Sequence, residues 1–156
     1  MAHKPIKILH FSPHAEDDGI AKYQEQYLAG MADNDAVENT FFSVKPIELR
    51  GMNPQQHEEV YDKLRAELDG YDIFHLQHEF GLFVEDDFQR LVATAKDLGK
   101  KVVITVHLSP DYAIKPVKLG GIGPRSMVSF LRQQRHRNRM YERHITPFLE
   151  ADLLIA

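Results

Sequence analysis

Cysteine is absent from this chain of 156 residues, and its absence excludes several kinds of site. Without thiols there are no disulfides, no thiolate ligands for zinc and no cysteine nucleophile. Disulfides belong mainly to oxidising compartments, so a chain that has none fits the cytosol best. We therefore expect a cytoplasmic protein.

Long apolar runs are also missing. No segment approaches the roughly 18 apolar residues that a transmembrane helix needs. The opening segment, MAHKPIKILHF, has neither the apolar stretch nor the small-residue cleavage site of a signal peptide. A net charge of −4 argues against general nucleic-acid binding. The composition, with 43% hydrophobic and 27% charged residues, is typical of a globular protein, and its length predicts one domain over 1–156.

Short apolar segments alternate with amphipathic segments along the whole chain. The clearest strand is KVVITV, which is β-branched and apolar. Nearly all-apolar strands that alternate with helices are typical of a parallel sheet covered on both faces. We predict an α/β fold, a Rossmann-like doubly wound parallel sheet with helices on both faces. The predicted strands are 7–12, 39–44, 72–76, 101–106 and 151–156, and the predicted helices are 20–31, 54–68, 86–98 and 126–150.

Polar residues at the carboxyl ends of these strands are the first candidates for a site, because ligands of doubly wound sheets bind there. His78, Glu79 and His107 each come at such an end. A histidine in that place can act as acid, base or hydrogen-bond donor near neutral pH. His75 lies inside a strand, and we predict that it is a buried, hydrogen-bonded structural residue.

A metal site is not predicted. The segment HLQHE matches neither HExxH nor its inversion HxxEH. Side chains alternate along a strand, so two histidines three residues apart face opposite sides. Zinc needs three or four convergent ligands. His107 and Glu79, from neighbouring strand ends, could contribute two of them, but nothing in the sequence demands a metal. We expect no metal and no bound cofactor.

The first loop gives weak evidence of anion binding. Gly19 opens a helix after the first strand, where backbone N–H groups can approach an anion, but there is no GxGxxG. Glu16, Asp17 and Asp18 would repel a phosphate. These carboxylates suit helix capping and hydrogen bonds to sugar hydroxyls instead.

A basic helix follows near the end of the chain, with six arginines and a single acid between residues 125 and 143. A solvated helix face is one interpretation, and contact with anionic lipid or a phosphate-bearing substrate is the other. A nucleic-acid surface is disfavoured because stacking aromatic residues are not interleaved. One stripe, which we call the arginine stripe, comprises Arg132, Arg135, Arg139 and Arg143. A second stripe, expected to pack on the sheet, comprises Phe130, Leu131, Tyr141, Ile145 and Phe148.

Four segments in order resemble motifs of one enzyme family. They are KILHFSPHAEDDGIAKYQEQYLAGM, YDIFHLQHEFGLF, GKKVVITVHLSP and EADLLIA. Together they resemble the N-terminal, acceptor-side half of a GT-B glycosyltransferase of the family 4 retaining type.

The resemblance implies two Rossmann-like domains facing a cleft and sugar transfer with retention, without a bound metal. It implies that His107 hydrogen-bonds the reacting sugar and is the catalytic candidate. It places Asp18 and Gly19 in the loop that faces the donor phosphates and the acceptor. It places His78 and Glu79 on the acceptor side of the pocket.

Two departures from the family matter. The family commonly has two glycines in the first loop, whereas Asp18 precedes Gly19 here. The C-terminal donor-binding domain is absent, so this chain is expected to be inactive alone, as an excised domain or one subunit of a split enzyme.

The implied partners are a nucleotide-sugar donor, held by the missing domain or a partner chain, and a sugar or lipid-linked acceptor. Because some members of this fold dock on membranes, the resemblance also favours an anionic surface at the inner face of the membrane. Two alternatives stay open: a non-catalytic sugar- or nucleotide-binding module, and a membrane-associated interaction domain.

Overall fold

Parallel strands form the centre of the molecule. The computed structural model describes residues 4–13, 19–83, 86–107 and 123–156. Within them the strands are β1 (Ile6–Phe11), β2 (Val37–Phe41), β3 (Ile73–His78), β4 (Lys101–Val106) and β5 (Leu153–Ile155). They form one 5-stranded sheet in the order β2-β1-β3-β4-β5, and every neighbouring pair is parallel.

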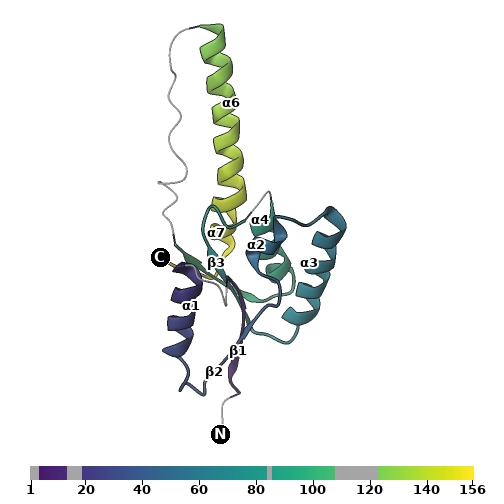
Figure 1. Cartoon of the computed structure of the whole chain (residues 1–156), viewed down its shortest axis with the longest axis vertical. Helices are drawn as coiled ribbons and strands as arrows, with labels where there is room; N and C mark the ends of the chain where they lie inside the picture. Colours follow the sequence, from purple (N-terminus) through teal and green to yellow (C-terminus); the bar gives the residue numbers. More distant parts are fainter. Residues whose placement is uncertain (1–3, 14–18, 84–85, 108–122) are drawn as a thin grey trace.

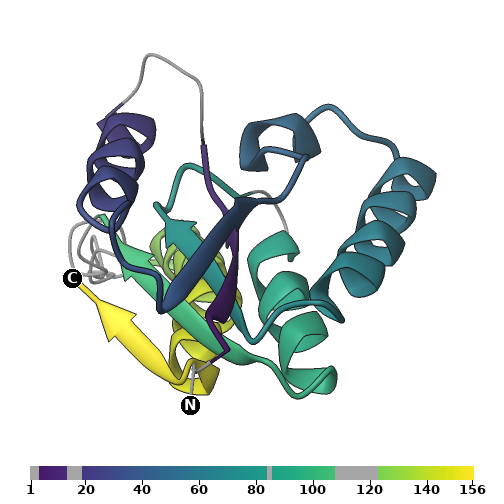
Figure 2. The ribbon, with the colours of Figure 1, turned by 90° about the horizontal axis from the view of Figure 1, so that it is seen from below.

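Helices cover both faces of this sheet, which confirms the predicted doubly wound fold. Figure 2 shows α1 on one side of the strands and α3 with α4 on the other. The helices are α1 (Gly19–Ala29), α2 (Pro46–Leu49), α3 (Pro54–Leu68), α4 (Asp87–Asp97), α6 (Pro124–Met140) and α7 (Thr146–Glu150), with a π-helix, η1 (Tyr141–Ile145), between the last two.

The strands present two chemically different faces because their side chains alternate. On the α3 and α4 side the packing is apolar: Phe74 and Leu76 of β3 are fully buried in one cluster with Leu64 and Phe88. Each such side chain contributes roughly 1.5–3 kcal/mol by leaving water. On the α1 side the same strands place polar residues toward their carboxyl ends, among them His10, His75, Gln77 and Thr105.

Local signals explain where the helices on the apolar side begin and end. Asn53 caps α3: its side chain accepts from the backbone N–H of Gln56, whose own side chain accepts from the backbone of Asn53. Pro54 then occupies the first turn, where no backbone donor is needed. At the end of α4, Gly99 has φ of 68°, the left-handed conformation that glycine adopts without strain.

Asp152 fixes the short edge strand β5 beside β4. Its carboxylate accepts hydrogen bonds from the backbone N–H of Val102 at 2.8 Å, from Lys96 at 2.9 Å and from Lys101 at 3.0 Å. These donors, the backbone one first, hold the pKa of Asp152 well below its usual range. The strand predicted within 151–156 is therefore confirmed as β5, and the hydrogen bonds of Asp152 hold it beside β4.

The basic helix does not pack as predicted. Figure 1 shows α6 extending away from the sheet, and none of its residues is buried. Leu131 is 57% exposed and Tyr141 is 44% exposed, so the expectation that both pack on the sheet is wrong. Phe148 does pack, at 7% exposure, because it lies in α7 after the π-helical turn.

Candidate functional site

The strand order reverses direction between β1 and β3, because the chain leaves β1 for β2 and leaves β3 for β4. Ligands of doubly wound sheets bind at the carboxyl ends of the strands beside such a reversal. His10 and His75 are register partners across this pair of strands. Both side chains lie on the face covered by α1, where Gln24 contacts His10.

A hydrogen-bonded network of buried polar side chains connects these two histidines. His10 Nδ1 lies 2.9 Å from His75 Nδ1 and 3.1 Å from Gln24 Nε2. The other nitrogen of His10 contacts Asn39 Oδ1 at 2.9 Å, and His75 Nε2 contacts Thr105 Oγ1 at 2.8 Å. His10, Gln24, His75 and Thr105 are all buried, so the network is internal.

Gln77 extends the network to His107 at the end of β4. Its amide nitrogen donates to Gln24 Oε1, and its amide oxygen contacts His107 Nε2. His107 is half-buried, and its ring lies edge-on to Tyr23 of α1 with 5.1 Å between the ring centroids. We call His10, Gln24, Asn39, His75, Gln77, Thr105 and His107 the histidine–amide network.

One set of tautomers satisfies the first part of this network. Asn39 Oδ1 can only accept, so the proton of His10 is on Nε2 and the single lone pair of His10 Nδ1 is shared between two donors, His75 and the amide of Gln24. His75 must then donate from Nδ1 to His10 and accept the hydroxyl proton of Thr105 at Nε2.

The same argument assigns the tautomer of His107, at the end of β4. Gln77 gives its NH₂ group to Gln24, so its oxygen accepts from His107 Nε2–H. The lone pair of a neutral His107 ring is then on Nδ1. The network therefore holds this imidazole in one tautomer.

The two buried histidines of the network, His10 and His75, are neutral at pH 7. Burial lowers the pKa of His10 from its ordinary value, outweighing a hydrogen bond to Asn39 that raises it. Burial, followed by repulsion from His10 and His107, lowers the pKa of His75 to about 3. The bonds described above join imidazole, amide and hydroxyl groups, and no carboxylate, ammonium or guanidinium group takes part in them.

His78 and Glu79 do not join the network. The His78 side chain points to the opposite face of the sheet, fully buried, with its ring centroid 4.3 Å from that of Phe88 and 4.8 Å from that of Phe148. The structure therefore places His78 in the aromatic core and not in a pocket wall. Glu79 is half-buried after β3, and its backbone oxygen accepts from Leu82 N–H at 2.9 Å.

The first-loop candidates divide between described and undescribed residues. Gly19 begins α1, is exposed, and would tolerate a Cβ, which would meet nothing within 4 Å. Space alone therefore does not require a glycine here. Asp18, together with Glu16 and Asp17, lies outside the described residues.

The four arginines of the arginine stripe lie in two different elements, three in α6 and one in η1. Arg132, Arg135 and Arg139 are exposed along α6. Arg143 lies in η1, where its Nε pairs with Asp86 Oδ1 at 2.8 Å. The three exposed arginines are the ones that remain available for the predicted anionic surface.

Neither a metal cluster nor a membrane-spanning helix is found in the part of the chain that the structure describes. There, no cluster of three or more His, Cys, Asp or Glu side chains is arranged to hold a metal ion. No helix in the same residues has the length and apolarity to cross a membrane. His75 and His78 lie on opposite faces, as the strand period predicted.

Comparisons with known proteins give few matches. No family model and no curated protein matches the chain. Among solved structures, a chain from Trypanosoma brucei, the glutaminase domain of CTPS with bound acivicin, is similar with a TM-score of 0.45 and 18% sequence identity. The match covers 64% of this chain and 36% of that chain, and at this level it carries no inference about activity.

These comparisons correct the family prediction. The similar structure is a glutaminase domain and not a glycosyltransferase, so the assignment to the acceptor half of a family 4 GT-B enzyme is contradicted. Sugar transfer and polysaccharide synthesis, which followed from that assignment, are contradicted with it. The predicted partners stay predictions.

Proposed function

We propose that this chain binds a small, uncharged polar molecule at the carboxyl ends of β3 and β4, and that His107 contacts it. The observation that carries the proposal is the continuous hydrogen-bonded path of imidazole and amide groups from His10 to His107, which contains no carboxylate, ammonium or guanidinium group. Such a path fixes the orientation of a half-buried imidazole beside the reversal of the strand order, where this fold binds ligands.

The chemistry of the network favours a ligand without charge. Transferring a charge into a partly buried site is costly unless an opposite charge meets it. The groups behind His107 are neutral amides and imidazoles, which suit hydroxyl and amide groups. In the sequence, Glu16, Asp17 and Asp18 follow β1 closely and further disfavour an anion.

His107 can supply a specific chemistry to such a ligand. An imidazole held in one tautomer accepts a hydrogen bond, or a proton, from a hydroxyl at a defined nitrogen. Gln77 is the positioning residue, because its oxygen accepts the Nε2–H of His107. Its removal should change the tautomer of His107 without removing the imidazole.

A titration with matched neutral and anionic probes tests the proposal. Backbone and imidazole NMR signals of the chain would be followed while uridine, myo-inositol or acetamide is added, each against its anionic counterpart: uridine monophosphate, inositol phosphate or acetate. We expect the neutral probes to shift the signals of His107 and of the ends of β3 and β4. Tighter binding of the anions, or shifts confined to other regions, would contradict the proposal.

Substitutions sharpen this test. His107→Ala should weaken the neutral probe by about tenfold, the effect of losing one hydrogen bond of ~1.4 kcal/mol. Gln77→Leu should weaken it less and should alter the long-range ¹H–¹⁵N pattern of His107. His136→Ala, an exposed histidine on α6, is the matched control and should change nothing.

A further inference from the structure

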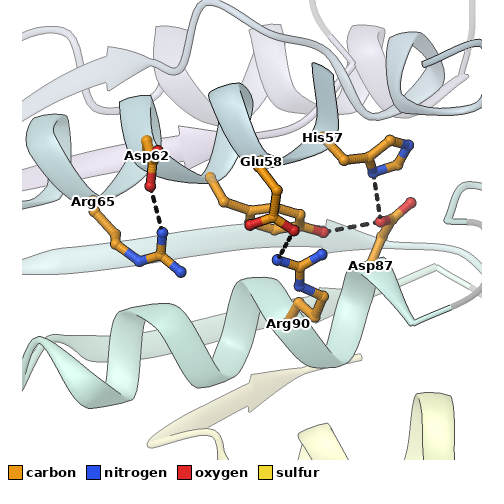
Figure 3. Close-up of polar contacts among 7 residues, drawn as sticks. His57, Glu58, Asp62, Arg65, Asp87 and Arg90 are labelled. Carbon is orange, nitrogen blue, oxygen red and sulfur yellow. Dashed lines mark hydrogen bonds and ion pairs between the residues drawn. The ribbon is translucent and has the colours of Figure 1, made fainter. Parts of the chain in front are cut away.

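A cavity lies between α2, α3 and α4, on the side of the sheet opposite α1. Its volume is about 330 Å³, which lies at the lower end of the range of cavities that bind small molecules. Figure 3 shows part of its polar lining, with His57 and Glu58 on α3 facing Asp87 and Arg90 on α4. The histidine–amide network contributes no residue to it.

Asp87 is the buried polar residue of this cavity. It begins α4 and is 4% exposed. One carboxylate oxygen, Oδ1, accepts from the hydroxyl of Tyr61 at 2.9 Å and lies 3.2 Å from His57 Nδ1 (Figure 3). The other, Oδ2, has no hydrogen-bond partner.

A buried carboxylate oxygen without a hydrogen-bond partner is uncommon, because burial removes its hydrogen bonds to water and nothing in the protein replaces them. Burial is the largest influence on Asp87 and raises its pKa, and the bonds from Tyr61 and His57 oppose that rise only in part. A donor that carries positive charge would satisfy this oxygen best.

Positive charge also lines the cavity. Arg50, the residue that caps the end of α2, is exposed and forms no ion pair within the described ranges 4–13, 19–83, 86–107 and 123–156. Arg90 is held in place, since it pairs with Glu58 at 2.8 Å and lies over the ring of Tyr61 at 4.0 Å. Arg50 is therefore the guanidinium that can take a carboxylate of a ligand.

Neither a simple cation nor a simple anion matches this lining. Two lining carboxylates are already paired, Glu58 with Arg90 and Asp86 with Arg143. Of the remaining charges, Asp87 would attract a cation that Arg50 repels, and an anion would meet the reverse. A molecule with both charges a short distance apart satisfies both ends. The apolar lining, Leu49 and Met52, supplies a surface for an aliphatic side chain.

We propose that this cavity binds a free amino acid with an apolar side chain, its ammonium group at Asp87, its carboxylate at Arg50 and its side chain against Leu49 and Met52. The site is separate from the one proposed at His107, since the two lie on opposite faces of the sheet and no residue of the histidine–amide network lines this cavity.

Calorimetry and NMR with chemically matched ligands test this site. Methionine, leucine and phenylalanine would be compared, and methionine would then be compared with N-acetylmethionine, which lacks the ammonium, and methioninamide, which lacks the carboxylate. We expect at least one free amino acid to bind and either blocked form to bind about tenfold more weakly or worse. Equal binding of the blocked forms, or no binding by any of the three amino acids at millimolar concentration, would overturn the proposal.

Two variants and two matched controls locate the site. Asp87→Asn and Arg50→Gln should each reduce affinity for the free amino acid, again by about tenfold. Asp62→Asn and Arg65→Gln remove the same charges from an exposed ion pair of 2.7 Å elsewhere on α3, visible in Figure 3, and should not reduce it.

Asp87 is buried, so Asp87→Asn can lower the stability of the fold as well as the affinity for the ligand. Arg50 is exposed, so Arg50→Gln should fold and can contradict the proposal by itself. Failure here is also distinguishable from failure at His107, because the amino acid should shift NMR signals of α2, α3 and α4 and leave those at the ends of β3 and β4 unchanged.

Discussion

His75 and His78 lie three residues apart in β3 and point to opposite faces of the sheet. Both are buried, and burial lowers the pKa of each to about 3. His75 has polar partners at both ring nitrogens, His10 and Thr105. His78 has one such partner, His144 at 3.0 Å, and its Nδ1 has none.

The difference between these histidines reflects two ways of filling a protein interior. On the α1 face, directional hydrogen bonds fix each ring and its tautomer. On the α4 and α7 face, aromatic rings surround His78 at centroid distances of 4.3 to 5.8 Å, and shape decides the packing. Losing a side chain should leave an unsatisfied polar atom on the first face and a cavity on the second.

The largest loss of stability should come from the aromatic face. Phe88→Ala removes a ring that is 1% exposed, and we expect it to lower the free energy of unfolding by about 3–5 kcal/mol, the sum of lost burial and a cavity. Urea denaturation followed by circular dichroism measures the change. A loss below ~1 kcal/mol would mean that this face is loosely packed, and the contrast between the faces would disappear.

A smaller loss is expected on the polar face. His75→Leu keeps the volume approximately but leaves the Thr105 hydroxyl without its acceptor, at a cost of about 1–3 kcal/mol. Thr105→Val in the same background should recover part of that loss, because both ends of the bond are then apolar. A double-mutant cycle measures the recovery, and strictly additive effects would show that this bond contributes nothing specific.

The sequence predicted most of the sheet but only part of the site, and particular residues show why. Strands such as 101–106 are β-branched and apolar, a strong local signal, and the structure confirms them. The four-residue α2 has no comparable period and was not predicted.

The histidine–amide network was missed although part of its signal was present. His75 and Gln77 have the spacing of one strand face, and Thr105 interrupts an apolar strand with a hydroxyl. Their common face could be inferred from alternation. Their pairing with His10 and Gln24 could not, because it depends on the strand order β2-β1-β3 and on the placement of α1.

The position of α6 was mispredicted for a different reason. An apolar stripe on a helix predicts that it packs, but not where the surface that covers it lies. Leu131 and Phe148 belong to one sequence stripe, yet the π-helical turn η1 separates the exposed segment from the buried one. Pro147, which has no N–H to give the preceding turn, lies just after this change.

Acidification should lower the stability of the protein through the buried histidines of both faces. A double substitution on one face separates the two contributions. The pKa is about 3 for His78 and about 4 for His144 in the folded protein, below the ordinary value of 6.5 in the unfolded chain. Between these values the unfolded state binds more protons, so stability falls as pH decreases from about 6.5 toward 4. His78→Phe with His144→Phe should reduce that slope and change stability little at pH 7.5, because both partners become apolar together.

The single variant His78→Phe is the control for this experiment. It leaves His144 Nδ1 without its partner and should be less stable at pH 7.5 than the double variant. Denaturant midpoints measured from pH 7.5 to 4 test both expectations. An unchanged slope in the double variant would assign the acid sensitivity to the histidines of the other face.

The smallest effect on stability is expected outside both faces, on α6. Arg132→Gln, Arg135→Gln and Arg139→Gln together remove exposed charges, and the free energy of unfolding should change by less than about 0.5 kcal/mol for each. The same variant tests the predicted contact with an anionic surface, by co-sedimentation with vesicles that contain phosphatidylserine at low and high salt.

A second triple variant separates the stripe from net charge. Lys63→Gln, Arg65→Gln and Lys100→Gln remove the same total charge from a different part of the surface. If α6 binds lipid, the α6 variant should lose salt-sensitive binding and the control should retain it, because the interaction decays within a Debye length of about 10 Å at 0.1 M salt. Equal loss in both variants would assign the effect to net charge, and no binding by the unsubstituted chain would leave the arginines as a solvated helix face.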